Sequence, residues 1–181
     1  SVRMYPSSSS AGEMLGDYAF GYCPNLEEVV LPTTLETMGN RPFVADSNLM
    51  GIQFAPETSE DSIPATSYYG SNFSCENGII FELDNNNYRD AVVQCLETRG
   101  VTSSSSVGPA ELEGITKLYD EAFMNCKELG TVDLSSSSLK EIPEYAFANA
   151  ENLTYAMIPS GCTKINDYAF SGVTELTEIM I

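Results

Sequence analysis

The side chains best suited to metal or redox chemistry are five cysteines, and their spacing argues against a metal site. They are Cys23, Cys75, Cys95, Cys126 and Cys162. No two of them are separated by the two to four residues typical of a zinc site, and the chain has no histidine to complete one. An odd count leaves at least one thiol unpaired in any disulfide scheme. We therefore expect no metal and no cofactor, and mainly buried free thiols, although Cys75 and Cys95 could pair in an oxidising compartment.

The remaining candidates for catalysis are weak. Without histidine, the chain lacks the commonest general base and the usual activator of a serine nucleophile. The segment "DNNNYRD" at 84–90 places polar side chains at alternate positions, as a calcium loop does, but it lacks that loop's glycine at position six and glutamate at position twelve. Nothing positions two carboxylates together, and there is no glycine-rich phosphate loop. We expect a plain turn at 84–90 and a protein that is not an enzyme.

The amino-acid composition limits the kinds of partner that the protein is expected to bind. The chain of 181 residues carries 26 acidic and 8 basic residues, a formal net charge of −18. Such a surface repels phosphate backbones and anionic lipids, so neither nucleic-acid binding nor membrane insertion is expected. No apolar run reaches the roughly 18 residues of a membrane span. The first residues, "SVRMYPSSSSAGEML", lack the apolar core of a signal peptide, so we expect any export signal to precede this numbering.

An internal repeat dominates the sequence. Phenylalanines at 20, 43, 123, 147 and 170 fall at short intervals of 23, 24 and 23 residues. Apolar residues recur five positions before and six, nine and eleven positions after each of them. The tail of each unit alternates like a short strand, and a single unit cannot bury its own apolar face. A fixed period of this length predicts a solenoid in which the strands form a parallel ladder around columns of phenylalanine and leucine.

The best copies are "LGDYAFGYCPNLEEVVLP" at 15–32 and "LYDEAFMNCKELGTVDLS" at 118–135. They resemble the leucine-rich repeat of the bacterial surface-antigen, or BspA-like, family. The resemblance covers 15–56 and 115–181, a little over half of the chain. It implies an α/β leucine-rich-repeat solenoid, with short helical turns at the Ala-Phe positions. It also implies an extracellular or cell-surface protein of a family often proposed to mediate attachment or protein binding.

The middle of the chain departs from the period. Residues 79–83 and 91–96 read as two strands joined by the polar turn at 84–90, which predicts a β-hairpin insertion. Segment 57–67 is rich in polar and structure-breaking residues and predicts a loop. We expect one leucine-rich-repeat domain over 1–181, with repeats at about 1–56 and 110–181 and an irregular insert at about 57–109. Cys23 and Cys126 share one repeat position, for which we expect buried thiols.

The exposed face of the strand ladder is the candidate binding surface. The alternation points Val30 outward together with seven residues that we select as candidate ligand-binding positions. These are Glu27, Glu28, Asp133, Tyr155, Met157, Glu178 and Met180. Tyrosine and methionine are enriched at interface centres. Two functions remain open: a non-catalytic adhesion or recognition module that binds a protein or a glycan, and a structural spacer that presents another domain.

The last strand-like segment, "LTEIMI" at 176–181, has no further copy after it in this sequence. An uncovered strand edge presents unpaired backbone groups that can pair with another chain. End-to-end self-association through this segment is therefore a further expectation.

Overall fold

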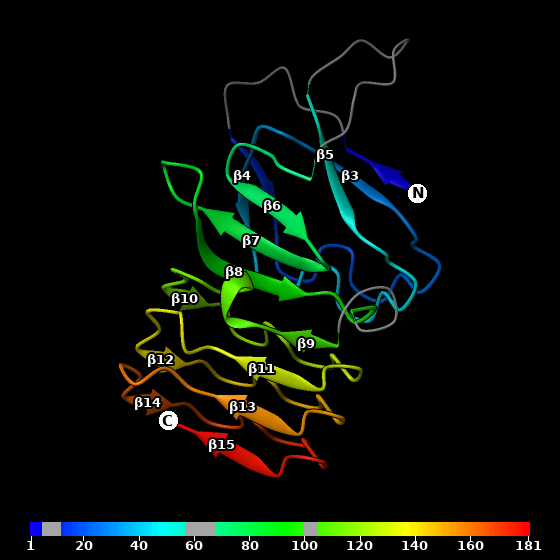
Figure 1. Ribbon diagram of the computed structural model, residues 1–181. Coiled ribbons are helices and arrows are strands. Elements are labelled where there is room, and N and C mark those ends of the chain that lie inside the picture. Colours follow the sequence, from blue (N-terminus) through cyan, green and yellow to red (C-terminus); the bar gives the residue numbers. More distant parts are fainter. Residues whose placement is uncertain (5–11, 57–67, 100–104) are drawn as a thin grey trace.

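The computed structural model describes residues 1–4, 12–56, 68–99 and 105–181, in which short strands stack into two arrays (Figure 1). The strands of the N-terminal array are β1 (Val2–Arg3), β2 (Glu13–Leu15), β3 (Val29–Pro32), β4 (Leu35–Met38) and β5 (Ile52–Ala55). Those of the C-terminal array are β9 (Ser106–Val107), β10 (Lys117–Leu118), β11 (Thr131–Asp133), β12 (Glu141–Ile142), β13 (Tyr155–Met157), β14 (Lys164–Ile165) and β15 (Glu178–Met180). Between the arrays lie β6 (Phe73–Glu76), β7 (Ile79–Leu83) and β8 (Arg89–Cys95).

The predicted parallel ladder is confirmed in both arrays. One ladder has the order β1-β3-β5 and the other β9-β11-β13-β15, and equivalent repeat positions pair with one another. The phenylalanines of the turns that precede these strands stack on one another in columns. Phe147 lies between Phe123 and Phe170, with ring centroids 5.0 and 5.1 Å apart, and Phe20 stacks on Phe43 at 5.7 Å. Each repeat thus buries an apolar face that it could not bury alone.

The prediction of helical turns at the Ala-Phe positions, and with it the α/β class, is wrong. The only helix within the described ranges is the short 3-10 turn η1 (Pro109–Glu111), which lies at none of these positions. The N–H of Phe123 instead donates to the carbonyl of Ala146 in the next repeat at 2.7 Å, and the N–H groups two residues to either side also donate to that repeat. A helix would need these N–H groups for bonds within its own segment. The turns therefore extend the stack, and the protein is an all-β solenoid.

The backbone of each Ala-Phe turn is left-handed on both sides of the phenylalanine. The residues two positions before and two after it have φ values from 40° to 73°. They are Tyr18, Tyr22, Arg41, Ala45, Glu121, Asn125, Tyr145, Asn149, Tyr168 and Gly172. A left-handed non-glycine residue costs roughly 1–2 kcal/mol. Three inter-repeat hydrogen bonds at about 0.5–1.5 kcal/mol each, together with the buried phenylalanine, offset that cost in an interior turn.

The middle of the chain forms a sheet that is buried on both faces. The predicted hairpin is confirmed as β7 and β8, and β6, which the sequence did not reveal, adds a third antiparallel strand. Side chains on one face pack into the C-terminal core, and those on the other face pack into the N-terminal core. The first group includes Ile79, Phe81, Val92 and Cys95, and the second includes Cys75, Ile80, Val93 and Leu96. Strand β10 pairs in parallel with β8, so the sheet continues into the C-terminal array.

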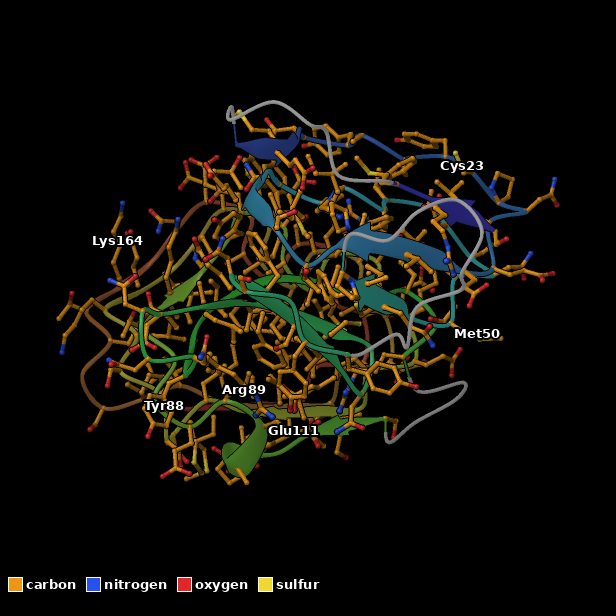
Figure 2. All side chains as sticks on the ribbon, turned by 90° about the horizontal axis from the view of Figure 1, so that it is seen from above. Cys23, Met50, Tyr88, Arg89, Glu111 and Lys164 are labelled. Atoms are coloured by element: carbon orange, nitrogen blue, oxygen red, sulfur yellow. The ribbon has the colours of Figure 1, made fainter. Side chains whose placement is uncertain are left out.

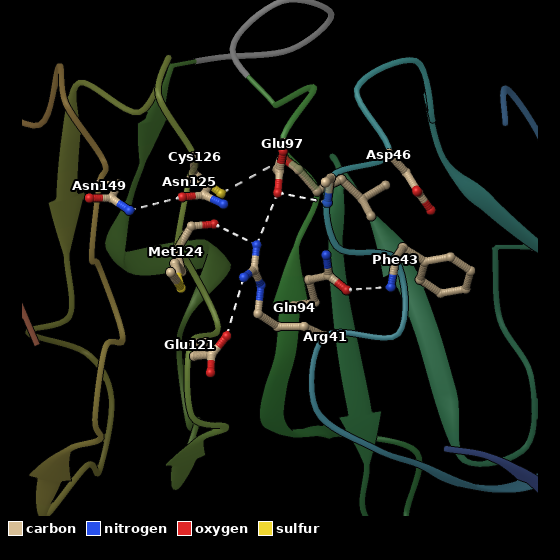
Figure 3. A network of polar contacts seen from close by, with 12 residues as sticks. Arg41, Phe43, Asp46, Gln94, Glu97, Glu121, Met124, Asn125, Cys126 and Asn149 are labelled. Carbon is tan, nitrogen blue, oxygen red and sulfur yellow. Dashed lines mark hydrogen bonds and ion pairs between the residues drawn. The ribbon is translucent and has the colours of Figure 1, made fainter. Parts of the chain in front are cut away.

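At the junction of this sheet with the N-terminal array, two side chains accept backbone hydrogen bonds from the last turn. In the turns that are followed by another repeat, backbone carbonyls of that repeat accept the equivalent bonds. The N–H of Phe43 donates to Gln94 Oε1 at 3.1 Å, and the N–H of Ala45 donates to Glu97 Oε1 at 3.0 Å (Figure 3). In the turns around Phe20, Phe123 and Phe147, the equivalent N–H groups donate to backbone carbonyls. The amide and the carboxylate therefore satisfy the last turn of the N-terminal array where its repeat period ends.

Arg41 joins all three parts of the molecule. Its guanidinium contacts Glu97 Oε1 at 2.9 Å and Glu121 Oε2 at 3.2 Å, and it donates to the carbonyl of Met124 at 3.3 Å (Figure 3). Glu121 also accepts a hydrogen bond from the hydroxyl of Tyr18 at 3.1 Å. Only 3% of the Arg41 side chain is exposed. This network fixes the N-terminal array against the middle sheet and the first turn of the C-terminal array. The single-domain organisation over 1–181 stays a prediction, and the predicted loop at 57–67 lies outside the described residues.

Candidate binding surface

The alternating polar segment at 84–90 is a turn, and the carboxylate of Asp84 accepts hydrogen bonds from its backbone. Asp84 Oδ1 accepts the backbone N–H of Tyr88 at 2.9 Å and that of Asn86 at 2.8 Å. These two hydrogen bonds lower the pKa of Asp84. Across the described ranges, no three histidine, cysteine, aspartate or glutamate side chains are grouped so that they could hold a metal ion.

All five cysteines are free thiols. Cys75 lies on β6 and Cys95 on β8, with β7 between them, and their side chains face opposite cores. Two strand spacings separate their backbones by about 10 Å, beyond the roughly 7 Å that a disulfide allows. The expected burial is confirmed for Cys126 but wrong for Cys23, which is exposed. Cys126 lies in an interior turn, whereas the turn that carries Cys23 stacks, among the described residues, only on the turn around Phe43.

The burial of these thiols predicts a sharp difference in reactivity. Burial raises the pKa of Cys75 to about 12, so only about one molecule in ten thousand carries its reactive thiolate at pH 8. We expect iodoacetamide at this pH to label Cys23 first in the folded protein, and to reach Cys75, Cys95 and Cys126 only after urea is added. Peptide mapping by mass spectrometry measures this order. Fast labelling of Cys75 in the absence of urea would contradict it.

Five of the seven predicted surface residues lie together on the C-terminal ladder. Tyr155 of β13 is paired in register with Glu178 of β15, and Met157 with Met180. Asp133 of β11 is next to Met157 on the other side. The hydroxyl of Tyr155 donates to Met180 Sδ at 3.4 Å, which holds the two side chains against each other. These residues form a small mixed surface of aromatic, thioether and carboxylate groups, which we call the C-terminal ladder face.

The other two predicted residues lie elsewhere. Glu27 and Glu28 are exposed just before β3, on the N-terminal ladder, and the middle sheet separates this ladder from the C-terminal one (Figure 1). Val30, which the alternation also points outward, is buried, with 2% of its surface exposed. The seven residues therefore do not form a single patch.

Glu27 and Glu28 instead line a groove that the sequence did not reveal. One recess of about 280 Å³ is bordered by these two glutamates, Met50, Gly51 and Tyr68. It adjoins a second recess of about 570 Å³, which shares the last three residues and continues to Tyr69 and Glu76. We call the two recesses together the N-terminal groove. The sequence could not reveal it, because the backbone of Tyr68 and Tyr69 is paired with β6, a strand that the repeat pattern does not predict.

One end of the N-terminal groove is held by an ion pair. Arg89 contacts both carboxylate oxygens of Glu76, and its guanidinium lies 4.7 Å from the ring centroid of Phe81. Burial alone would raise the pKa of Glu76, but the hydrogen bonds and the charge of Arg89 outweigh it and lower that pKa. Figure 2 shows Tyr88, Arg89 and Glu111 close together along one edge of the molecule, whereas Met50 lies at the right of the view and Lys164 at the left.

The sequence profile of the BspA type leucine rich repeat region matches residues 8–89 and 102–181 in six copies, one more than the five phenylalanines indicate. The chain belongs to the BspA-type leucine-rich repeat family. The resemblance stated from the motifs is thereby confirmed. No curated protein sequence matches the chain.

Two solved structures are similar to the chain in fold. The chain is 18% identical to a leucine rich cell surface protein from Faecalibacterium prausnitzii A2-165, with a TM-score of 0.57 over 92% of this chain and 50% of that one. It is 20% identical to the pneumococcal vaccine antigen PcpA, with a TM-score of 0.65 over 96% of this chain and 43% of that one. The chain thus spans half or less of the length of these two proteins. Within the described ranges, no helix has the length and apolar character that a membrane span requires.

Proposed function

We propose that the chain is a non-catalytic recognition module of a cell-surface or secreted protein, and that it binds a protein or a glycan over its strand ladders. Its membership of the BspA-type family carries this proposal. The solved relatives support it, because one is described as a cell surface protein and the other as a vaccine antigen. The acidic surface supports a partner that is neither nucleic acid nor anionic lipid.

The C-terminal ladder face is the first surface to test. We expect Tyr155→Ala and Met157→Ala to weaken binding of a captured surface protein or glycan by about tenfold each, since half-buried aromatic and thioether side chains often dominate interfaces. Binding is measured by surface plasmon resonance, after a pull-down with the folded chain has identified the ligand. Lys164→Ala on β14 is the matched control, because it changes an exposed residue of another ladder. Unchanged affinity in both ladder-face variants would place the site elsewhere.

A structural spacer is the second candidate function. The stacked, stiff construction of the solenoid favours it, since each repeat contacts only its neighbours along one direction. A spacer would tolerate substitutions across both ladders and would capture no ligand in the same pull-down.

The exposed edge of β15 supports a further proposal, that this edge pairs with a second copy of the chain in end-to-end self-association. Ile179 and Ile181 are 40% and 78% exposed, whereas their counterparts one repeat earlier, Ala156 and Ile158, are buried. The N–H groups of Tyr168, Phe170 and Gly172 donate to no other described residue, unlike those of the preceding turns. End-to-end self-association would appear as a concentration-dependent sedimentation coefficient. A constant monomer value over the accessible concentrations would exclude it.

A further inference from the structure

The N-terminal groove combines an open floor with exposed adaptable side chains. Its two recesses share Met50 and Tyr68, which are 55% and 56% exposed. Gly51 forms the floor between them, and a Cβ placed on it would meet no atom within 4 Å. Tyrosine and methionine bury a large area at low entropic cost and adapt to varied shapes. The groove therefore has the apolar content of an interface centre without a covering element among the described residues.

The charge of this groove has one sign. Glu27 and Glu28 are exposed on its rim, and neither forms an ion pair. Between residues 12 and 99 the only cations in the sequence are Arg41, Arg89 and Arg99. Each of these arginines already contacts a glutamate, and the one that borders the groove region, Arg89, is held by Glu76. Arg3 of β1 lies beside β3, opposite Val30, but it lines neither recess, so the residues that line the two recesses include three glutamates and no lysine or arginine.

The four lysines lie in the other half of the molecule. Lys117, Lys127, Lys140 and Lys164 all belong to the C-terminal array or its loops. None of them lines the groove, and the net charge of the whole chain is already −18. A partner that enters it gains from positive charge and loses from negative charge.

We propose that the N-terminal groove binds a basic, arginine- or lysine-bearing segment of a protein partner. The inference rests on the proposed recognition function and assigns to it a second surface and a partner chemistry. Arginine is the side chain best matched to the groove, because its guanidinium stacks on tyrosine rings while contacting carboxylates. Sulfated or sialylated glycans would be repelled by Glu27 and Glu28. A neutral glycan would gain nothing from the two rim charges.

The test uses a fluorescein-labelled peptide of alternating arginine and alanine, with a peptide of alternating glutamate and alanine as its counterpart. We expect the folded chain to bind the arginine peptide, to ignore the glutamate peptide, and to lose affinity as salt increases. Gly51→Arg should weaken binding at least about tenfold, because it fills the groove floor and reverses its charge. The double variant Glu27→Gln, Glu28→Gln should weaken it about fivefold, as two rim charges are removed.

Gly16→Arg is the matched control. It adds the same charge to the same array, and its Cβ also meets no atom within 4 Å. It follows β2, which pairs with β4 in a two-stranded ladder separate from β1-β3-β5. We expect it to change the affinity for the arginine peptide by less than about twofold, since distant surface charges are screened. Equal losses in Gly51→Arg and Gly16→Arg would mean diffuse attraction to an acidic protein and would overturn the proposal. Thermal unfolding of each variant establishes that it is folded.

The outcomes separate this inference from the proposed function. If the arginine peptide does not bind but the chain captures a ligand that Tyr155→Ala releases, the groove proposal fails and the recognition function stands. If the chain captures nothing and binds no peptide, both fail. If a neutral oligosaccharide bound without salt dependence and Gly51→Arg abolished that binding, the assignment of a basic partner to the groove would be overturned.

Discussion

Replacing Arg41 by methionine is expected to lower the free energy of unfolding by about 2–4 kcal/mol. The substitution removes the cation that joins Glu97 and Glu121 and leaves two poorly solvated carboxylates facing each other. Side-chain exposure is 16% for Glu97 and 23% for Glu121, so water can still solvate both carboxylates in part. The expected loss of unfolding free energy is therefore smaller than for a fully buried pair. Methionine keeps most of the aliphatic volume, so the effect reports the lost charge and hydrogen bonds.

Urea unfolding followed by circular dichroism measures this change. Lys127→Met is the matched control, because it breaks the ion pair with Glu151, in which both side chains are about half exposed. Such a pair contributes at most about 1 kcal/mol. Similar losses for the two variants would contradict the assignment of Arg41 as the junction between the arrays. A second, earlier unfolding transition in Arg41→Met would show that the N-terminal array separates from the rest.

Truncation of Phe147 to alanine is the second change with a large expected effect. Its ring is fully buried and is stacked on both sides, by Phe123 and Phe170. Removing it deletes the middle of the aromatic column and leaves a cavity that neighbouring repeats cannot close, because each is held by its own ladder hydrogen bonds. We expect a loss of about 3–5 kcal/mol, the range for a buried phenylalanine.

The same truncation at Phe170 provides the comparison within one column. This ring is only partly buried and stacks on one neighbour, so Phe170→Ala should cost less than half as much. Chemical unfolding of both variants under the same conditions gives the ratio. If Phe170→Ala were as destabilising as Phe147→Ala, stacking on both sides would not be the source of the column's stability.

Part of the candidate surface could be predicted from the sequence. The alternation after each phenylalanine correctly grouped Tyr155, Met157 and Met180, because neighbouring copies pair in register and equivalent positions come together. It failed at Val30, and it placed Glu27 and Glu28 on a surface that the middle sheet separates from the other five residues. The N-terminal groove depends on how Tyr68 pairs with β6, and a repeat pattern carries no information about an insertion.

The sequence by itself determined the repeat, the parallel ladders, the aromatic columns, the hairpin and the family, because each is encoded within a single period or a short contiguous run. Only the tertiary structure decided which groups form hydrogen bonds with backbone N–H groups when the partner lies outside the same repeat. The Ala-Phe turns are not helices because their N–H groups bond to the next repeat, and the last N-terminal turn is satisfied by Gln94 and Glu97. Arg41 is buried because the middle sheet brings Glu97 and Glu121 to it across 56 and 80 residues of sequence. Such contacts between distant segments follow from how the arrays pack, which no local spacing specifies.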